Sequence, residues 1–209
     1  MEVVWHHPFT SLIVGPTKSG KTEFVKKFVK NVDQLVDTKP HKILWCYSEY
    51  QPGYDELIKV RDLEMIEGIP DINTLKGPEP KLVVFDDFMT EFAKQKNSDL
   101  ISLFTRGCHH WNCSVMHVVQ NLFYNKLRTA RINSHYIVML KNPSDRLQVM
   151  NLARQLYPSK QKYFVEAYDD ACSEPYGYLL VDLAPETANE IRLRCNIFPG
   201  ELSYAYLSK

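Results

Sequence analysis

The sequence predicts an α/β fold in which a mostly parallel central sheet carries helices on both of its faces. Apolar runs of strand length alternate with amphipathic helical stretches over most of the chain, which is typical of parallel sheets. A glycine-rich loop joins the first apolar run to the first helix, and a later run ends directly in Asp86 and Asp87. Strands buried on both faces are continuous apolar runs, and ligands bind where such strands end.

The predicted elements follow one another in a regular order. Residues 9–14 form the first apolar run, and residues 21–36 carry apolar side chains at helical spacing on one face. Further strands are expected at residues 42–47, 63–66, 81–87, 113–119, 135–140 and 176–182, and further helices at residues 54–59, 98–109, 144–157 and 159–171.

No stretch is rich enough in Gly, Ser or Pro to separate two domains. We therefore expect one domain over residues 1–209, with a core at about residues 8–142 and a C-terminal extension of helices and a strand at about residues 143–209. The amino-terminal segment has neither the basic region nor the cleavage site of a signal peptide.

Composition excludes several classes of protein. Hydrophobic residues make up 44% of the 209 positions and charged residues 24%, which is ordinary globular usage. Lys and Arg number 25, as do Asp and Glu, so the chain does not coat nucleic acid by bulk positive charge. Contacts with nucleic acid would require local basic patches, or several copies acting together.

Cysteine usage and hydropathy indicate the compartment. The five cysteines are an odd number without the spacing of a disulfide framework, which favours a reducing, intracellular environment. No apolar run approaches the roughly 20 residues that span a bilayer. We therefore expect no membrane partner.

The loop at residues 15–22 has the G-x-x-x-x-G-K-[ST] spacing of a phosphate-binding P-loop, between a strand and a helix. Its glycines let backbone N–H groups turn inward around phosphate oxygens, and the helix adds the positive end of its dipole. Lys21 is expected at the β- and γ-phosphates, and the Thr22 hydroxyl as a Mg²⁺ ligand. The predicted nucleotide-binding residues are Gly15, Pro16, Thr17, Lys18, Ser19, Gly20, Lys21 and Thr22.

Two further strand ends are expected at the same edge of the sheet. Asp86 is predicted to be the carboxylate on the Mg²⁺ side, and Asp87 the general base or the residue that positions water. Two adjacent acids favour attack by water over transfer to another acceptor. Gln120, at the end of the next buried strand, is predicted to sense the γ-phosphate or to orient water.

Hydrolysis also calls for a cation near the transferred phosphate, since the charge of the transition state spreads over three oxygens. Arg106, Arg128 and Arg131 are the candidates, and the sequence does not choose among them. Arg106 precedes Gly107 at an expected helix end, from which it could reach a neighbouring subunit. The cluster at residues 108–113 contains two cysteines and two histidines, but it crosses from a helix end into a strand, so we expect packing rather than zinc binding.

Several segments together resemble one family of ATPases. Besides the P-loop, they are Val83 to Asp87, Leu103 to His110, Ser114 to Phe123, Lys141 to Asp145, Tyr176 to Leu183, and Asn196 to Glu201. On these residues the chain resembles the viral genome-packaging ATPases of the FtsK–HerA superfamily, of the poxvirus type, with the greatest likeness to versions from Polinton/Maverick elements and adintovirus-like viruses. The likeness covers about residues 8–201.

The resemblance implies a RecA-like ASCE core, hydrolysis of ATP with Mg²⁺, a homo-oligomeric ring (often a hexamer), and translocation of double-stranded DNA into a capsid. It also implies capsid or portal-vertex partners and a location inside the infected host cell, at assembling virions. In that family Lys21, Thr22, Asp86, Asp87 and Gln120 would have the roles given above, and an arginine would act across the subunit interface.

The sequence departs from the family pattern at a few positions. Asp87 stands where many related ATPases have Glu, and Cys108 and Trp111 stand where relatives often have a small polar and a basic residue.

The function predicted from the sequence is therefore an ATP-hydrolysing motor that translocates DNA. In a ring, lysines and arginines of several neutral subunits would converge on a pore. The candidates are Lys94, Lys96, Lys126 and Arg128. Two alternatives stay open, namely a P-loop nucleoside or nucleotide kinase, and a nucleotide-dependent scaffold without hydrolysis.

Overall fold

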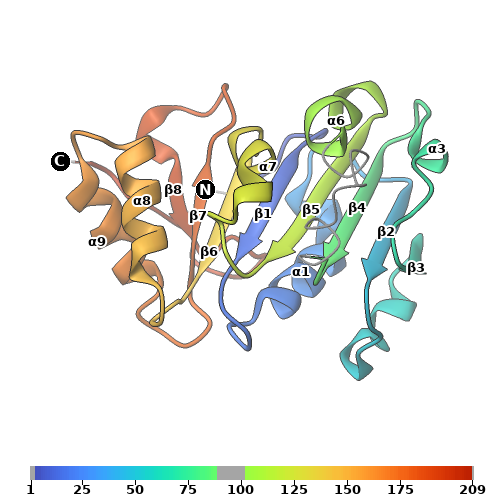
Figure 1. The fold of residues 1–209 in the computed structure, drawn as a ribbon, viewed down its shortest axis with the longest axis horizontal. Coiled ribbons are helices and arrows are strands. Elements are labelled where there is room, and N and C mark those ends of the chain that lie inside the picture. The colour runs from blue at the N-terminus through green and yellow to red at the C-terminus, as the bar shows by residue number, and fades with distance from the viewer. Residues whose placement is uncertain (1–2, 89–101, 209) are drawn as a thin grey trace.

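The computed structural model of the chain describes residues 3–88 and 102–208, and within them nine strands form a single sheet (Figure 1). Along the sheet the strands follow the order β3-β2-β4-β5-β1-β6-β7-β8-β9. The strands are β1 (Thr10–Val14), β2 (Lys42–Tyr47), β3 (Leu63–Glu67), β4 (Lys81–Asp86), β5 (Cys113–Val119), β6 (Tyr136–Leu140), β7 (Tyr178–Asp182), β8 (Leu193–Cys195) and β9 (Tyr204–Ala205).

The first six strands in this order, β3-β2-β4-β5-β1-β6, are parallel, as predicted. β5 lies between β1 and β4, with Val14 of β1 opposite Val119 of β5. The carboxyl ends of β1, β5 and β4 therefore lie next to one another, at the edge where ligands bind in open α/β sheets. The last three strands continue the sheet in antiparallel pairs, and Leu140 of β6 lies opposite Tyr178 of β7.

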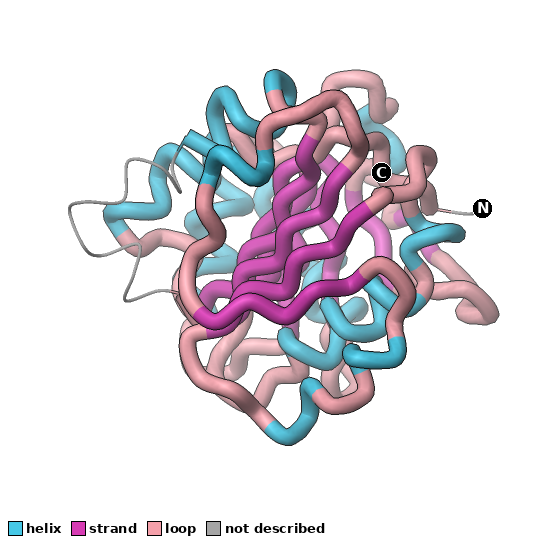
Figure 2. Tube along the Cα trace, turned by 90° about the vertical axis from the view of Figure 1, so that its right-hand side faces the viewer, coloured by secondary structure: helices cyan, strands magenta, loops and turns pink. Residues whose placement is uncertain are grey.

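Helices cover both faces of the sheet (Figures 1 and 2). The regular helices are α1 (Lys21–Lys30), α2 (Val32–Leu35), α3 (Ile72–Leu75), α6 (Cys108–His110), α7 (Arg128–Ile132), α8 (Arg146–Leu156) and α9 (Gln161–Ala171). Short 3₁₀ turns occupy Pro52–Tyr54, Leu57–Lys59, Asn125–Leu127 and Asn189–Ile191, and a π-helical turn, Leu103–Gly107, leads into α6.

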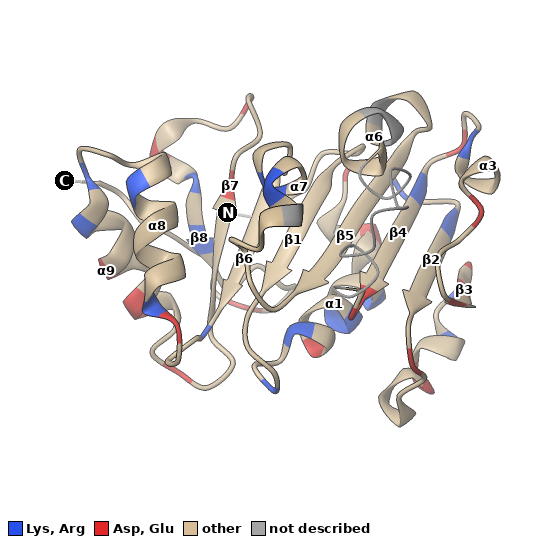
Figure 3. Cartoon of the chain, viewed as in Figure 1, with Lys and Arg blue, Asp and Glu red and all other residues tan. Residues whose placement is uncertain are grey.

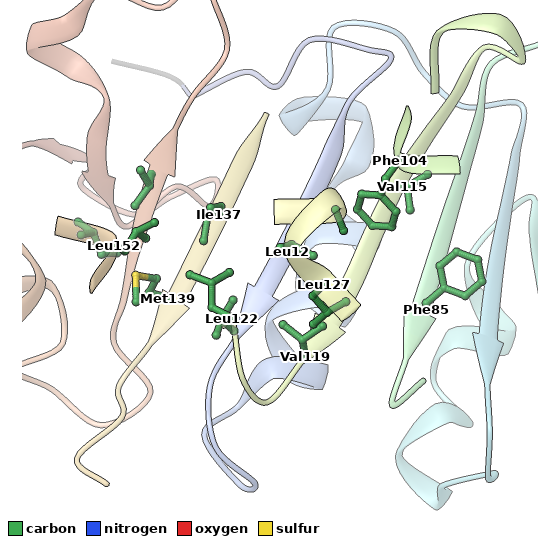
Figure 4. Close-up of a cluster of buried hydrophobic side chains, with 14 of the residues drawn as sticks. Leu12, Phe85, Phe104, Val115, Val119, Leu122, Leu127, Ile137, Met139 and Leu152 are labelled. Atoms are coloured by element: carbon green, nitrogen blue, oxygen red, sulfur yellow. The ribbon is translucent and has the colours of Figure 1, made fainter. Parts of the chain in front are cut away.

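Each face of the sheet has its own apolar core, because side chains of a strand alternate between faces. Leu12 belongs to a cluster on one face that includes residues of α7, α8 and α9, and part of this cluster is drawn in Figure 4. Ile13 belongs to the cluster on the other face, with Phe24 and Phe28 of α1. Burial on both faces is the reason that these strands are continuous apolar runs in the sequence.

The second core extends to the amino-terminal segment. The Trp5 side chain is fully buried, and its ring stacks on that of Tyr136 with a centroid distance of 4.1 Å. The backbone of Trp5 also bridges to Val36. Residues before position 8 therefore contribute to the core, which the sequence predicted only from about residue 8.

The structure corrects several predicted elements. The helix expected at residues 21–36 is broken at Asn31, whose N–H bonds to the Phe28 carbonyl and whose side-chain amide bonds to the Lys27 carbonyl. Where one helix was expected at residues 54–59, the chain forms two 3₁₀ turns, and α7 lies in a segment for which no helix was predicted. β8, β9 and α3 were not predicted. Residues 98–101 of the helix expected at 98–109 lie outside the described residues.

Charged side chains lie mainly on helices and loops, while the central strands carry almost none (Figure 3). Among the residues that the structure describes, no helix has the length and apolar character that crossing a membrane requires.

Candidate functional site: a phosphate-binding loop and its carboxylates

The P-loop turns sharply between β1 and α1. Gly20 has φ of 96°, a left-handed conformation that a side chain disfavours, and α1 begins at the next residue. The Ser19 hydroxyl is buried and makes no hydrogen bond within the described part of the chain. A buried polar group without a partner at a helix N-terminus fits a loop that accepts an anion.

Lys21 lies over this loop, where its Nζ donates a 2.7 Å hydrogen bond to the Pro16 carbonyl. Burial lowers the pKa of Lys21, and the nearby charges of Asp86 and Asp87 oppose that effect. The ammonium group is thus held between the loop and the two acids, where phosphate oxygens would exchange for the Pro16 carbonyl.

Asp86 is the last residue of β4 and is buried. Its Oδ1 accepts a 3.3 Å hydrogen bond from the Thr22 hydroxyl, and its Oδ2 accepts a 2.9 Å hydrogen bond from the Tyr54 hydroxyl. Burial raises the pKa of Asp86, Asp87 adds to the rise, and the two hydrogen bonds together with Lys21 counteract it. Both hydroxyl donors therefore favour the carboxylate form.

Asp87 lies beside Asp86 in sequence but in a different environment. It has φ of 60°, and its side chain is exposed. The Ser48 hydroxyl donates a 3.2 Å hydrogen bond to the Asp87 carbonyl, which helps to hold this strained turn. One acid is thus buried and doubly hydrogen-bonded, while the other is open to water, as a base that activates water requires.

These residues surround one cavity of about 450 Å³ at the carboxyl edge of the sheet. Gln120 follows the last residue of β5 and reaches the same cavity. The structure therefore brings together the predicted lysine, threonine, acids and glutamine. The lining residues are Thr17, Lys18, Gly20, Lys21, Thr22, Glu23, Gln51, Asp86, Asp87, Val118, Gln120 and Tyr176.

The oxygens of Thr22 and Asp86 fit a Mg²⁺ ion that also binds phosphate and water. They lie 3.3 Å apart, and hydroxyl and carboxylate oxygens are the hard donors that Mg²⁺ prefers. Within residues 3–88 and 102–208, no group of three or more His, Cys, Asp or Glu side chains is arranged to hold a metal by itself. The donor set accordingly fits an ion that arrives with a nucleotide.

The candidate arginines lie elsewhere. Arg131 of α7 donates a 3.3 Å hydrogen bond from Nη1 to the Leu122 carbonyl, and its guanidinium lies 4.2 Å from the Phe123 ring centroid. Burial lowers its pKa, as does the neighbouring charge of Arg128, whose side chain is exposed. Neither lines the cavity. The backbone of Arg106 lies in the π-helical turn, and its side chain is outside the described set.

The assignment of an arginine that acts across a subunit interface stays a prediction. The same holds for the lysines of the expected pore. Lys94 and Lys96 lie outside the described residues, as does the side chain of Lys126.

The cysteines of the segment at residues 108–113 are buried. Burial raises the pKa of the Cys108 and Cys113 thiols to about 12, which disfavours the thiolate that zinc requires.

Gln51, Tyr54 and Tyr176 are among the residues of the site that were not predicted from the sequence. Gln51 precedes the short helix predicted at residues 54–59, Tyr54 is the first residue of that predicted helix, and Tyr176 lies in the loop before β7. Nothing in the local sequence indicated that the Tyr54 hydroxyl reaches Asp86. The sequence placed Tyr176 at the start of a strand.

No protein-family model matches the chain, and no curated protein matches it. Solved structures do match. The genome packaging NTPase B204 from Sulfolobus turreted icosahedral virus 2, in complex with ATP-gammaS, is 12% identical with a TM-score of 0.58, covering 94% of this chain and 100% of that chain. In complex with sulfate, B204 is 11% identical with a TM-score of 0.56, covering 87% and 95% of the two chains.

The cytoplasmic domain of the Thermomonospora curvata Type VII Secretion ATPase EccC is 14% identical with a TM-score of 0.57, over 85% of this chain and 24% of that chain. At these identities the likeness establishes the fold alone. The predicted fold class is confirmed, namely the RecA-like α/β fold of P-loop NTPases.

Proposed function

We propose that this protein hydrolyses ATP with Mg²⁺ and uses the energy to translocate double-stranded DNA into a viral capsid. The observation that carries the proposal is the convergence of Lys21, Thr22, Asp86, Asp87 and Gln120 on one cavity at the end of three adjacent strands. The solved structure of B204, described as a genome packaging NTPase, supports the packaging role through its fold.

In the proposed reaction, backbone N–H groups of the P-loop and the Lys21 ammonium hold the β- and γ-phosphates. Mg²⁺ bound by Thr22 and, through water, by Asp86 would neutralise charge on those phosphates. The Asp87 carboxylate takes a proton from water while the water oxygen bonds to the γ-phosphorus and the bond to the β-phosphate oxygen breaks. Gln120 orients the attacking water by a hydrogen bond.

The chain has no net charge, which supports assembly as a homo-oligomeric ring for the translocation step. Several copies would have to combine their basic side chains to hold a DNA backbone. In such a ring an arginine of one subunit would complete the site of the next, and capsid or portal-vertex proteins would be the further partners. Action inside the infected host cell, at assembling virions, forms part of the same proposal.

Phosphate release from ATP, measured with and without double-stranded DNA, tests the proposal. We expect hydrolysis that DNA stimulates, and its loss in Lys21→Ala and Asp87→Asn. Lys162→Ala is the matched control, because Lys162 is exposed on α9 and pairs only weakly with Glu166, at 3.5 Å. Stimulation should fall as salt rises, since DNA binding releases counterions.

The same assay separates the alternatives. Transfer of the γ-phosphate to an added nucleoside or nucleotide in place of water would identify a kinase. Binding of ATP without any hydrolysis by the assembled protein would identify a scaffold.

A further inference from the structure

A second cavity, of about 560 Å³, adjoins the phosphate cavity. The two cavities share Gly20, Glu23 and Tyr176. The second one lies beside the ends of β6 and β8 and the start of β7, with Leu140, Tyr178 and Cys195 in its lining. It therefore continues the carboxyl edge of the sheet past the P-loop, and its size falls within the range of small-molecule sites.

The direction of a bound nucleotide follows from the P-loop itself. Asp87 and Gln120 mark the γ-phosphate end, and Lys21 with Thr22 marks the β- and γ-phosphates. The residue after Thr22 is Glu23, on the first turn of α1, and Glu23 lines both cavities. The end of the nucleotide away from the γ-phosphate thus points to the second cavity. An acceptor pocket of a kinase would have to lie at the opposite end.

Tyr176 stands between the two cavities in an unusual conformation. It has φ of 63°, and 68% of its surface is exposed. A side-chain atom at Gly20 would lie 3.0 Å from Tyr176 Cδ1, so the ring lies against the start of α1. A bulky residue in this region of φ is strained. Burial of an apolar side chain does not explain the strain here, because the ring faces solvent.

The loop that carries Tyr176 is fixed at both ends. The backbone N–H of Lys141 donates a 3.0 Å hydrogen bond to the Gly177 carbonyl, and Lys141 Nζ donates a 2.7 Å hydrogen bond to the Ser173 carbonyl. A Cβ at Gly177 would lie 2.4 Å from the Ala171 carbonyl oxygen, so only glycine fits this close approach. The ring of Tyr176 is therefore presented by a braced loop.

The lining of the second cavity combines aromatic faces with hydrogen-bond acceptors. Phe24, Tyr178 and Phe198 form mutual edge contacts with centroid distances of 4.8 to 6.1 Å. Carboxylates of Glu23 and Glu174 also line the cavity. A flat aromatic ring with an amino donor, attached to a sugar with hydroxyl donors, matches this combination.

We propose that the second cavity binds the base and ribose of the nucleoside triphosphate, and that the Tyr176 ring stacks on the base. This inference rests on the proposed function, because it assumes that the P-loop holds the phosphates. In this proposal Tyr176 makes the site bind a nucleoside triphosphate more tightly than a polyphosphate without a base.

Calorimetric titration in Mg²⁺ tests the inference with two probes, a non-hydrolysable ATP analogue and inorganic triphosphate. In the wild-type protein we expect the analogue to bind more tightly than triphosphate. Tyr176→Ala should lower the affinity for the analogue on the order of tenfold, as loss of one base–aromatic stack does. The affinity for triphosphate should stay unchanged. Tyr176→Phe should bind both ligands as the wild type does, because the ring is retained.

Leu202→Ala is the matched control, since Leu202 is exposed to nearly the same extent, 70%, and lines neither cavity. Equal affinity of Tyr176→Ala and wild type for the analogue would overturn the inference, as would an equal loss for both ligands. In that event, triphosphate binding that is lost in Lys21→Ala would still support the proposed phosphate site, although the proposed base site would be wrong. If neither probe binds the wild type, the proposed function fails together with the inference.

Discussion

The hydroxyl of Tyr54 donates a 2.9 Å hydrogen bond to Oδ2 of Asp86, across 32 residues of sequence. Tyr54 is itself buried, and its ring contacts those of Trp45, Tyr47 and Tyr50 at centroid distances of 5.6 to 5.7 Å. The segment that follows is tied to α1, because Glu56 forms ion pairs with Lys26 and Lys30. The buried acid of the site is thus held also by a segment outside the P-loop.

Replacement of Tyr54 by Phe should weaken the affinity of the site for magnesium while preserving the ring packing. A hydrogen bond to a charged group contributes about 1.5–3 kcal/mol, so we expect the magnesium concentration at half-maximal hydrolysis to rise about tenfold. Tyr50→Phe is the control, because it removes a comparable hydroxyl bond, 2.6 Å to Asp55, on the surface of the same aromatic group. An unchanged magnesium dependence in Tyr54→Phe would contradict the role given to this hydrogen bond.

Replacement of Asp87 by Asn should separate binding from hydrolysis. The Asp87 side chain is exposed, so its loss leaves the buried Asp86 and its two hydrogen bonds in place. We expect nucleotide affinity near that of the wild type and a turnover about 10²–10⁴-fold lower, the usual effect of losing a general base. Binding and single-turnover hydrolysis measured on the same preparation check this. Undiminished turnover would assign the proton transfer to another group.

His117 predicts a fall of stability in acid. Its ring is fully buried in β5, between those of Phe85 and Phe104, and burial lowers its pKa to about 3. In the unfolded chain the His117 imidazole binds a proton as the pH falls below about 6.5, whereas in the folded chain it stays neutral down to a pH of about 3. This contribution to stability is therefore complete above pH 6.5 and is lost at about 1.4 kcal/mol per pH unit below it.

Denaturant titrations between pH 7 and pH 5 measure this loss. The slope of the unfolding free energy against pH should be smaller in His117→Leu than in the wild type. The difference should be up to about 1.4 kcal/mol per pH unit, which corresponds to the uptake of one proton on unfolding. Equal slopes in the two proteins would show that His117 does not carry the effect.

Substitution at Gly177 should destabilise the chain, whereas substitution at Gly53 should not. An alanine Cβ at position 177 meets backbone atoms at 2.4 Å, and overpacking of this kind costs about 1–3 kcal/mol. At Gly53 the one atom within 4 Å in the described part of the chain is Lys26 Nζ, at 3.5 Å, an ordinary contact. Thermal melting of Gly177→Ala and Gly53→Ala compares the two. Similar melting temperatures would contradict the close approach at Gly177.

Much of the fold could be predicted because its signals are local. The P-loop is contiguous in sequence from Gly15 to Thr22, and the apolar run of β4 ends in its acids without interruption. Parallel order then follows from the alternation of strands and helices, which also brings the end of β5 to the same edge as the P-loop. The central strands β1, β2, β4, β5 and β6 and their parallel order were therefore predicted correctly.

The remainder depends on contacts that sequence spacing does not reveal. Tyr54 reaches Asp86 from a turn segment without a motif, and Tyr176 reaches the P-loop from a distant loop. β8 and β9 have three and two residues, too few for a visible period of two. The break at Asn31 could not be predicted, because the apolar face of α1 continues into α2. In the structure, the bond of the Asn31 side chain to the backbone of α1 marks the end of that helix.

The position of β1 in the middle of the sheet has a consequence for synthesis of the chain. β1 is the first strand to be made, yet its two neighbours are β5 and β6, and Phe9 finds its partner Ser114 only 105 residues later. Until those strands leave the ribosome, an apolar strand with unpaired edges stays accessible to other chains. Completion of the sheet around β1 must therefore wait until β6, which ends at Leu140, has been synthesised.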